Sequence, residues 1–216
     1  MQSLKNEFRE FLRTYFNNIQ LRSPLFFKAK WSLRFDLQSG EVGTEEYFNE
    51  VVRRAKHLFQ ESFDVNDSVI FYIVDFKWKR RKLRFSNCCF KNITDLTKDE
   101  IKYHTIKRMY DSGDGSETSN TALLKILRNR INHEDVFRAI ANKDFSRQPG
   151  LDQYGALGNK EIYFINLDRQ IIFHMYDDRG LDIIASDREA IKPLYIKHKD
   201  WILESNRSEI DKSFNN

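Results

Sequence analysis

The segment EIYFINLDRQIIFHMYDDRGLDIIAS, residues Glu161–Ser186, is the longest apolar stretch in this polar chain and the key to its architecture. It contains three short runs rich in β-branched and aromatic residues, Glu161–Leu167, Gln170–Tyr176 and Leu181–Ala185. The polar turns between these runs predict a three-stranded antiparallel meander. Because the middle run is apolar on both faces, we expect it to be a central strand that is covered on both sides.

The rest of the chain predicts further strands and helices. Apolar side chains at helical spacing predict an amphipathic helix over residues 3–20, ended by Ser23-Pro24. Alternation, apolar runs and capping residues predict strands at 30–37, 68–76 and 83–90, helices at 44–62, 133–143 and 193–204, and a short helix from Thr97. Residues 121–131 fit either a strand or a helix, with a strand favoured, and residues 206–216 are expected to fray.

Together these elements predict an α+β fold, with a largely antiparallel sheet of about six or seven strands and helices mainly on one face. We expect one domain over residues 1–216. Within it, the amphipathic helix of residues 1–22 is expected to pack on the body, with pairing to another chain as the alternative.

The composition limits what can be inferred about partners and compartment. With 36 basic and 32 acidic residues among 216, the net charge of +4 is too small to indicate nucleic-acid binding by itself. The two cysteines, Cys88 and Cys89, lack metal-ligand spacing, and in the expected strand they would point to opposite faces. Two thiols without a disulfide framework, no signal sequence and no apolar run long enough to span a membrane predict a cytoplasmic protein.

The turn after the middle strand holds the first candidate site. Its residues are Tyr176, Asp177, Asp178, Arg179 and Asp182. This pattern suits a tight turn, an acidic patch on which a cationic partner docks, or, with a nearby histidine, a metal site. We favour a structural turn that takes part in an interface, with Tyr176 as its aromatic anchor.

The second candidate site would act on nucleic acid. Asp36 and Asp75 close two predicted strands, and Lys77 follows in the acid-x-lysine pattern with which many metal-dependent nucleases hold a cation and position water. The cationic tip beside it carries Trp78, Arg80 and Arg81. Such side chains can contact phosphates and stack on a base. The pattern is short and common by chance, so this site is the alternative.

Several segments together resemble a known bacterial family. They are FINLDRQIIFHMYDDRGLDIIAS (164–186), Leu194–Leu203 with Trp201, Arg84–Asn87 and Ala139–Phe145. As a set they are similar to the uncharacterised family catalogued as domain of unknown function 3885, over about residues 30–212. That resemblance implies no particular activity.

The run Phe173–Ile184 is also similar to strand–turn segments of immunity proteins from bacterial toxin systems. The resemblance implies a small cytoplasmic protein that binds and neutralises a toxin domain. Immunity proteins that block nucleases are usually acidic, and the net charge of +4 departs from that pattern.

These observations favour a non-enzymatic cytoplasmic binding protein, with neutralisation of a toxin domain as the specific hypothesis. We expect a protein partner rather than nucleic acid or a membrane, and no cofactor or bound metal. The alternatives are a metal-dependent enzyme that acts on nucleic acid, and a structural or regulatory subunit that pairs through its N-terminal helix.

Overall fold

The computed structural model describes residues 3–76, 83, 87–107, 118–145, 157 and 160–215. In this part of the chain a single sheet runs in the order β1-β7-β6-β5-β2-β4-β3, and every neighbouring pair is antiparallel. The strands are β1 (Trp31–Asp36), β2 (Ser68–Asp75), β3 (Lys102–Lys107), β4 (Thr118–Leu127), β5 (Lys160–Asn166), β6 (Ile171–Met175) and β7 (Gly180–Ala185). The predicted α+β class with an antiparallel sheet is confirmed.

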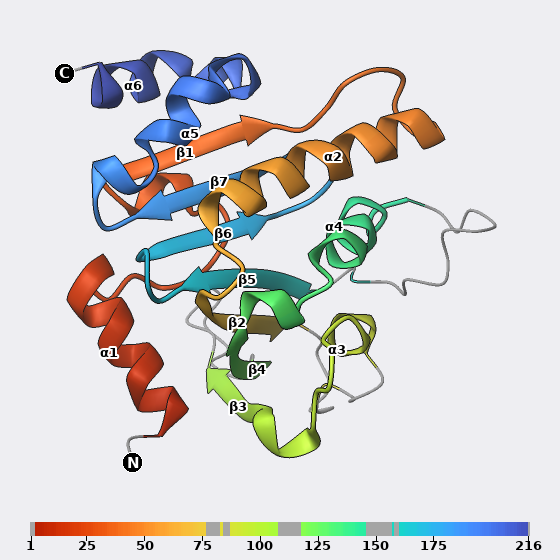
Figure 1. Ribbon diagram of the computed structural model, residues 1–216, viewed down its shortest axis with the longest axis vertical. Coiled ribbons are helices and arrows are strands. Elements are labelled where there is room, and N and C mark those ends of the chain that lie inside the picture. The colour runs from red at the N-terminus through yellow and green to blue at the C-terminus, as the bar shows by residue number, and fades with distance from the viewer. Residues whose placement is uncertain are drawn as a thin grey trace.

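The helices gather mainly on one face of this sheet (Figure 1). They are α1 (Leu4–Phe16), α2 (Glu45–Ser62), α3 (Cys88–Lys91), α4 (His133–Ala141), α5 (Lys192–Lys197) and α6 (Glu204–Phe214). Short 3-10 turns, η1 (Phe26–Lys28), η2 (Lys98–Glu100), η3 (Arg128–Arg130), η5 (Arg188–Ala190) and η6 (Lys199–Trp201), complete the described elements. In Figure 1, α2 crosses the front of the sheet, with α5 and α6 above it.

The predicted meander is confirmed as β5, β6 and β7. Every residue of β6 and β7 is buried. Phe173 in the middle strand pairs with Phe164 on one side and with Ile183 on the other. The expectation that the middle run is a covered strand therefore holds, because helices lie over both faces of this part of the sheet.

The sheet has a hydrophobic core on each face, and side-chain alternation assigns residues to them. On the larger side, α2, α4 and α5 cover odd-numbered residues of β1 and β2, such as Leu33 and Phe71. On the other side, α1 buries an aromatic stripe against even-numbered residues such as Ile70. The stripe consists of Phe8, Phe11, Leu12 and Phe16. The stripe is therefore buried against the sheet.

The N-terminal helix is shorter than its hydrophobic pattern suggests. It ends at Phe16, because Asn17 and Asn18 adopt left-handed conformations with φ of 49° and 57°. The backbone N–H of Asn18 then donates a hydrogen bond to the carbonyl oxygen of Leu12 at 2.9 Å. Asparagine is among the few residues that take this conformation readily. The helix boundary expected before Pro24 is therefore set earlier, by asparagine.

Two other expectations about local structure are wrong. Residues 88–91 form a helical turn rather than the end of a strand, since the Asn87 side chain accepts from the backbone N–H of Cys89 at 3.0 Å and starts α3. The C-terminal segment does not fray but forms α6. Its Ile210 and Phe214 are buried, and the ring of Phe214 stacks on Tyr195 at 5.0 Å.

Several boundaries are confirmed closely. Thr44 caps α2 by accepting from the N–H of Tyr47 at 3.2 Å. Thr97 and Glu100 form the expected capping box. The ambiguous segment 121–131 is mostly strand β4, as favoured.

The helix expected over 193–204 is instead interrupted, with α5 ending at Lys197 and a 3-10 turn following.

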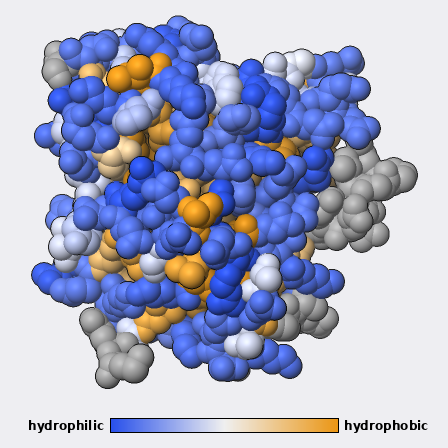
Figure 2. Space-filling view, in the orientation of Figure 1, coloured by the Kyte–Doolittle hydropathy of each residue, from blue (hydrophilic) through white to orange (hydrophobic). Residues whose placement is uncertain are grey.

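The face that carries α2 is mainly hydrophilic, with small separate apolar patches rather than one large patch (Figure 2). None of the described helices is long and apolar enough to cross a bilayer.

Candidate binding site

The three aspartates of the predicted turn are buried rather than displayed. Asp177 accepts from its neighbour Arg179 three times, from the backbone N–H at 2.8 Å, from Nε at 2.9 Å and from NH2. Asp178 accepts from the Tyr47 hydroxyl of α2 at 2.5 Å. Asp182 has no exposed surface. These carboxylates therefore fix the turn from inside, and the surface of the turn is not acidic.

Asp182 holds three segments of the chain together. Its register neighbour on β1 is Arg34, whose Nε and NH2 atoms donate to the carboxylate at 2.7 and 2.9 Å. The same carboxylate accepts from the backbone N–H groups of Leu25 and Phe26 at 2.9 and 3.1 Å. A buried carboxylate needs this number of partners to offset the loss of hydration. The segment between α1 and β1 is thereby attached to the meander.

An open pocket of about 360 Å³ lies over this arrangement, and we call it the Arg34 pocket. Its lining comes from the segment before η1, from β1 and its end, from the β6–β7 turn and from the residue before α6: Ser23, Pro24, Arg34, Asp36, Gln38, Tyr176, Arg179 and Leu203. Three of the predicted site residues, Tyr176, Arg179 and Asp36, thus meet at one place.

Beside the exposed Pro24 and Gln38 and the half-buried Asp36, the Arg34 pocket presents cationic and aromatic groups. The side chain of Arg179 is 67% exposed, and beside the pocket Phe27 is 64% exposed. The Arg34 guanidinium lies 5.3 Å from the ring of Phe27 and 5.7 Å from that of Tyr176. Contacts of this kind favour a cation over the faces of aromatic rings. They also keep Arg34 in place while its own side chain is only 12% exposed.

The ionisation of these groups follows from burial and from their partners. Burial raises the pKa of Tyr47 to about 12 and raises that of Tyr176 as well, so both remain neutral phenols at ordinary pH. Burial also raises the pKa of Asp178. The hydrogen bond to Asp177 raises the pKa of Arg179. At neutral pH the exposed member of the turn is therefore a permanent cation.

The segment leading into β1 adds positive charge beside the site. These basic residues were not among those predicted from the sequence. Between residues 21 and 35 the chain has four basic residues, Arg22, Lys28, Lys30 and Arg34, and no acidic one. Burial lowers the pKa of Lys28, and the neighbouring Arg22 lowers it further. This charge run was visible in the sequence. Its position beside the turn was not, because only the pairing of β1 with β7 brings the two together.

His174, the histidine that precedes the turn, is buried in the sheet. Its ring is fully buried, stacks on Tyr163 at 4.3 Å and contacts the Ile162 carbonyl oxygen through Nδ1 at 2.8 Å. Burial lowers the pKa of His174, which keeps the ring neutral. Among the described residues, no three histidine, cysteine or acidic side chains are grouped as metal ligands.

The two described residues proposed for nucleic-acid chemistry, Asp36 and Asp75, do not come together. Asp36 and Asp75 end strands that are separated by three others, which places them about 19 Å apart at the usual strand spacing. Alternation also puts them on opposite faces, since Asp36 lines the Arg34 pocket whereas Asp75 follows the register of the α2-side core and contacts Lys160 at 3.9 Å. The other proposed residues, Lys77, Trp78, Arg80 and Arg81, lie outside the described residues.

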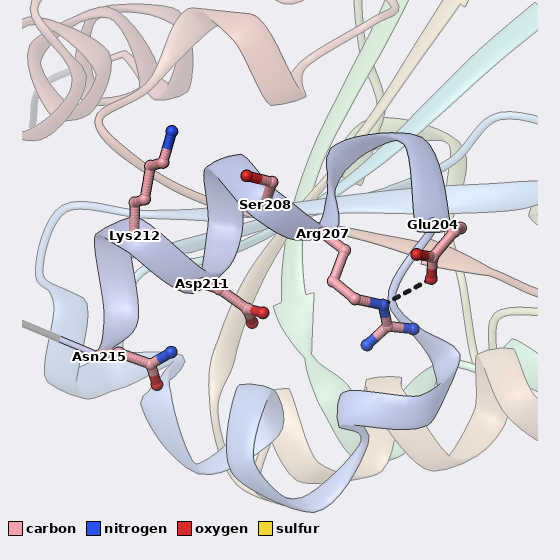
Figure 3. Close-up of a pocket in the computed structure, with 6 residues that line it drawn as sticks. All are labelled: Glu204, Arg207, Ser208, Asp211, Lys212 and Asn215. Atoms are coloured by element: carbon pink, nitrogen blue, oxygen red, sulfur yellow. Dashed lines mark hydrogen bonds and ion pairs between the residues drawn. The ribbon is translucent and has the colours of Figure 1, made fainter.

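A second hollow, of about 570 Å³, runs along α6 (Figure 3). Five of the residues that line it belong to that helix and the sixth is its C-cap, Asn215: Glu204, Arg207, Ser208, Asp211, Lys212 and Asn215. Several of its polar groups already have partners. Arg207 donates to Glu204 at 2.6 Å, and Tyr195 donates to Asp211 at 2.7 Å. This groove has mixed charge and no exposed aromatic group in its lining, so we regard the Arg34 pocket as the better candidate.

Comparison with known proteins finds one curated relative and one matching family. It is 27% identical over 175 residues to the "Uncharacterized protein YnaE" of Bacillus subtilis (strain 168), which covers 79% of this chain and 81% of that protein. No solved structure matches it significantly. Residues 8–206 match the model of one protein family. Because this match spans most of the sequence, the chain belongs to the family described as Domain of unknown function (DUF3885).

Proposed function

We propose that this protein is a non-enzymatic binding module that contacts another protein through the Arg34 pocket and the adjoining Phe27. The observation that carries the proposal is the division of roles at the turn. The aspartates are buried and hold the backbone, whereas an arginine and an aromatic ring are presented to solvent.

This composition suits a protein interface. Arginine and aromatic side chains contribute a large share of binding energy when they lie at the centre of a contact. The turn is also held before binding, because Asp177, Asp178 and Asp182 fix it through buried hydrogen bonds. A preorganised surface loses less conformational entropy on association.

The charge of the surface indicates the charge of the partner. The exposed Arg179 and the basic run of residues 22–34 favour a partner with an acidic contact surface. A bacterial toxin domain is the partner class that we propose to test first. Its support is the resemblance of Phe173–Ile184 to immunity proteins, because this run includes the turn that lines the pocket.

The test compares two double variants in capture from a lysate of the source organism. Phe27→Ala with Arg179→Ala removes the exposed groups of the site. Ile196→Ala with Lys197→Ala is the matched control on α5, where the two side chains are each 65% exposed. The control lies on the α2 side of the sheet. Thermal unfolding of both variants establishes that each is folded.

We expect a stoichiometric partner that is captured by the wild type and by the α5 control but not by the pocket variant. With the purified partner, the pocket variant should bind about 30-fold more weakly, the effect of losing one strong contact of about 2 kcal/mol. Binding should weaken further as salt is raised. Co-expression with the partner then tests neutralisation directly, since a toxin domain should arrest growth unless this protein is present. Equal binding by both double variants would remove the pocket from consideration.

A further inference from the structure

The excess of positive charge in this protein lies in its first 30 residues. That segment has six basic and two acidic side chains, whereas the remaining 186 residues have 30 of each. Its described residues form α1 and the connection to β1, and they pack on the face of the sheet opposite α2. The net charge of +4 is small for the whole chain, but this segment places a cationic surface on one side of the sheet.

Three of the cations form a row along α1. Lys5, Arg9 and Arg13 follow one another at intervals of four residues, so they lie on one ridge about 6 Å apart. Arg9 and Arg13 are exposed, and Lys5 is half-buried. Burial lowers the pKa of His104 on β3, and the charges of Lys5 and Arg9 lower it further. The row therefore begins beside β3 and runs towards the end of α1.

The connection to β1 extends this surface beyond the end of α1. The Nζ atom of Lys28 donates to the carbonyl oxygen of Gln20 at 3.0 Å, which brings Lys28 back towards the helix. Burial lowers the pKa of Lys28, and the charge of the exposed Arg22 lowers it further. Lys28 and Arg22 are therefore close neighbours that continue the positive charge.

The two acidic side chains of this segment have cationic partners. Glu7 accepts from Lys125 of β4 at 2.5 Å, and Glu10 pairs with Arg13. The side chains of Glu10 and Arg13 are 54% and 67% exposed. Exposed pairs of this kind contribute little stability and are screened by salt. Exchange of Glu10 for a phosphate as the partner of Arg13 is therefore readily reversible.

An exposed aromatic ring lies close to the end of the row. Tyr15 is 41% exposed, and its ring centroid is 5.2 Å from that of the buried Phe11. The core thus supports the ring from below and leaves part of it accessible to a ligand. Cations that follow a phosphate backbone, together with aromatic rings on which bases stack, are typical of proteins that bind single-stranded nucleic acid.

We propose that this surface binds single-stranded nucleic acid, with phosphates on the cations and a base stacked on Tyr15. The cations are Lys5, Arg9, Arg13, Arg22 and Lys28. This function is separate from the protein contact proposed above, since no residue of α1 lines the Arg34 pocket. An acidic protein would also match the cations, but it has no base to stack on Tyr15.

The experiment measures fluorescence anisotropy of a labelled single-stranded DNA of about 20 nucleotides, titrated with the full-length protein. With about five phosphate contacts, the affinity should fall about 100-fold between 50 and 200 mM salt. Arg9→Glu with Arg13→Glu should weaken binding at least about tenfold and reduce the salt dependence. Tyr15→Leu keeps an apolar contact with Phe11 but removes the stacking ring, so it should weaken binding about tenfold with the salt dependence unchanged. An RNA of the same sequence shows which of the two nucleic acids binds more tightly.

The matched control is Lys197→Glu with Lys199→Glu, the same change of charge on side chains that are 65% and 47% exposed. It should bind as the wild type does, and thermal unfolding establishes that every variant is folded. The proposal is overturned if the wild type does not bind the DNA at 50 mM salt, or if both charge reversals weaken binding equally. It is equally overturned if a glutamate peptide of the same length binds as tightly as the DNA, because the surface would then fit an acidic protein.

Discussion

Replacement of Asp182 by alanine should destabilise the protein severely. The carboxylate has no exposed surface and accepts four hydrogen bonds, two from Arg34 and two from backbone N–H groups. Removing one partner of a buried ion pair costs about 3–5 kcal/mol, since the other charge remains buried and unpaired. We therefore expect Asp182→Ala to lower the free energy of unfolding by about 4 kcal/mol. For a chain of this length that corresponds to a fall in Tm of about 8–16 °C.

The assay is urea unfolding followed by tryptophan fluorescence, with thermal unfolding as a second measure. The control is Glu10→Ala, which removes an ion pair with Arg13 whose side chains are 54% and 67% exposed and should hardly change the midpoint. The double variant Arg34→Leu with Asp182→Leu should recover the part of the loss that comes from the unpaired charge of Arg34. It should not recover the part that comes from the backbone N–H groups of Leu25 and Phe26, which lose their acceptor. A loss below about 1 kcal/mol for Asp182→Ala, the size of an ordinary surface effect, would refute the argument.

Three further predictions concern single residues. Gly180→Ala should cost about 1–3 kcal/mol in urea unfolding, because its new Cβ would lie 2.5 Å from a backbone oxygen of β1 and would also clash with the Tyr176 hydroxyl. Hydrogen bonds from Arg53 lower the pKa of Glu50 to about 2, below the ordinary 4.5. The stability it contributes is therefore complete above pH 4.5 and is lost as the pH falls towards 2, so Glu50→Gln should flatten the acid-unfolding curve in that window. Burial lowers the pKa of His133 from 6.5 to about 4, so its contribution is complete above pH 6.5 and is lost as the pH falls towards 4. His133→Phe should reduce the difference in unfolding free energy between pH 7 and pH 4.5, and an unchanged difference would contradict this assignment.

Local sequence patterns were enough to predict the meander and most of the sheet. The three strands of the meander are separated by short turns, so register and direction follow from neighbouring residues. The cap at Thr44 has the same character, since its hydrogen bond spans only three residues. The predicted elements were wrong where the local preference of one residue favoured a different backbone conformation. Asn17 ended α1 before the proline could, and Asn87 started a helical turn where a strand was expected.

The candidate site was predictable only in part, because its contacts are long-range. Tyr176 and Arg179 were predicted as neighbours within one turn, and the structure places both at a pocket. The burial of Asp178 depends on Tyr47, which is 131 residues away in the chain. That of Asp182 depends on Arg34, at a separation of 148. When these long-range partners are unknown, the run of aspartates in the sequence predicts an acidic surface.

The pairing of β1 with β7 also determines how long β1 waits for its partner strand during translation. β1 leaves the ribosome before β7. In the register of these two strands, Asp36 of β1 lies opposite Gly180 of β7. At about 5–20 residues per second, the 144 residues between these positions take about 7–30 s to translate. During that interval Leu33 and Phe35, which are fully buried in the finished protein, have no strand beside them. Holding chaperones should therefore engage β1 in the nascent chain until the meander emerges.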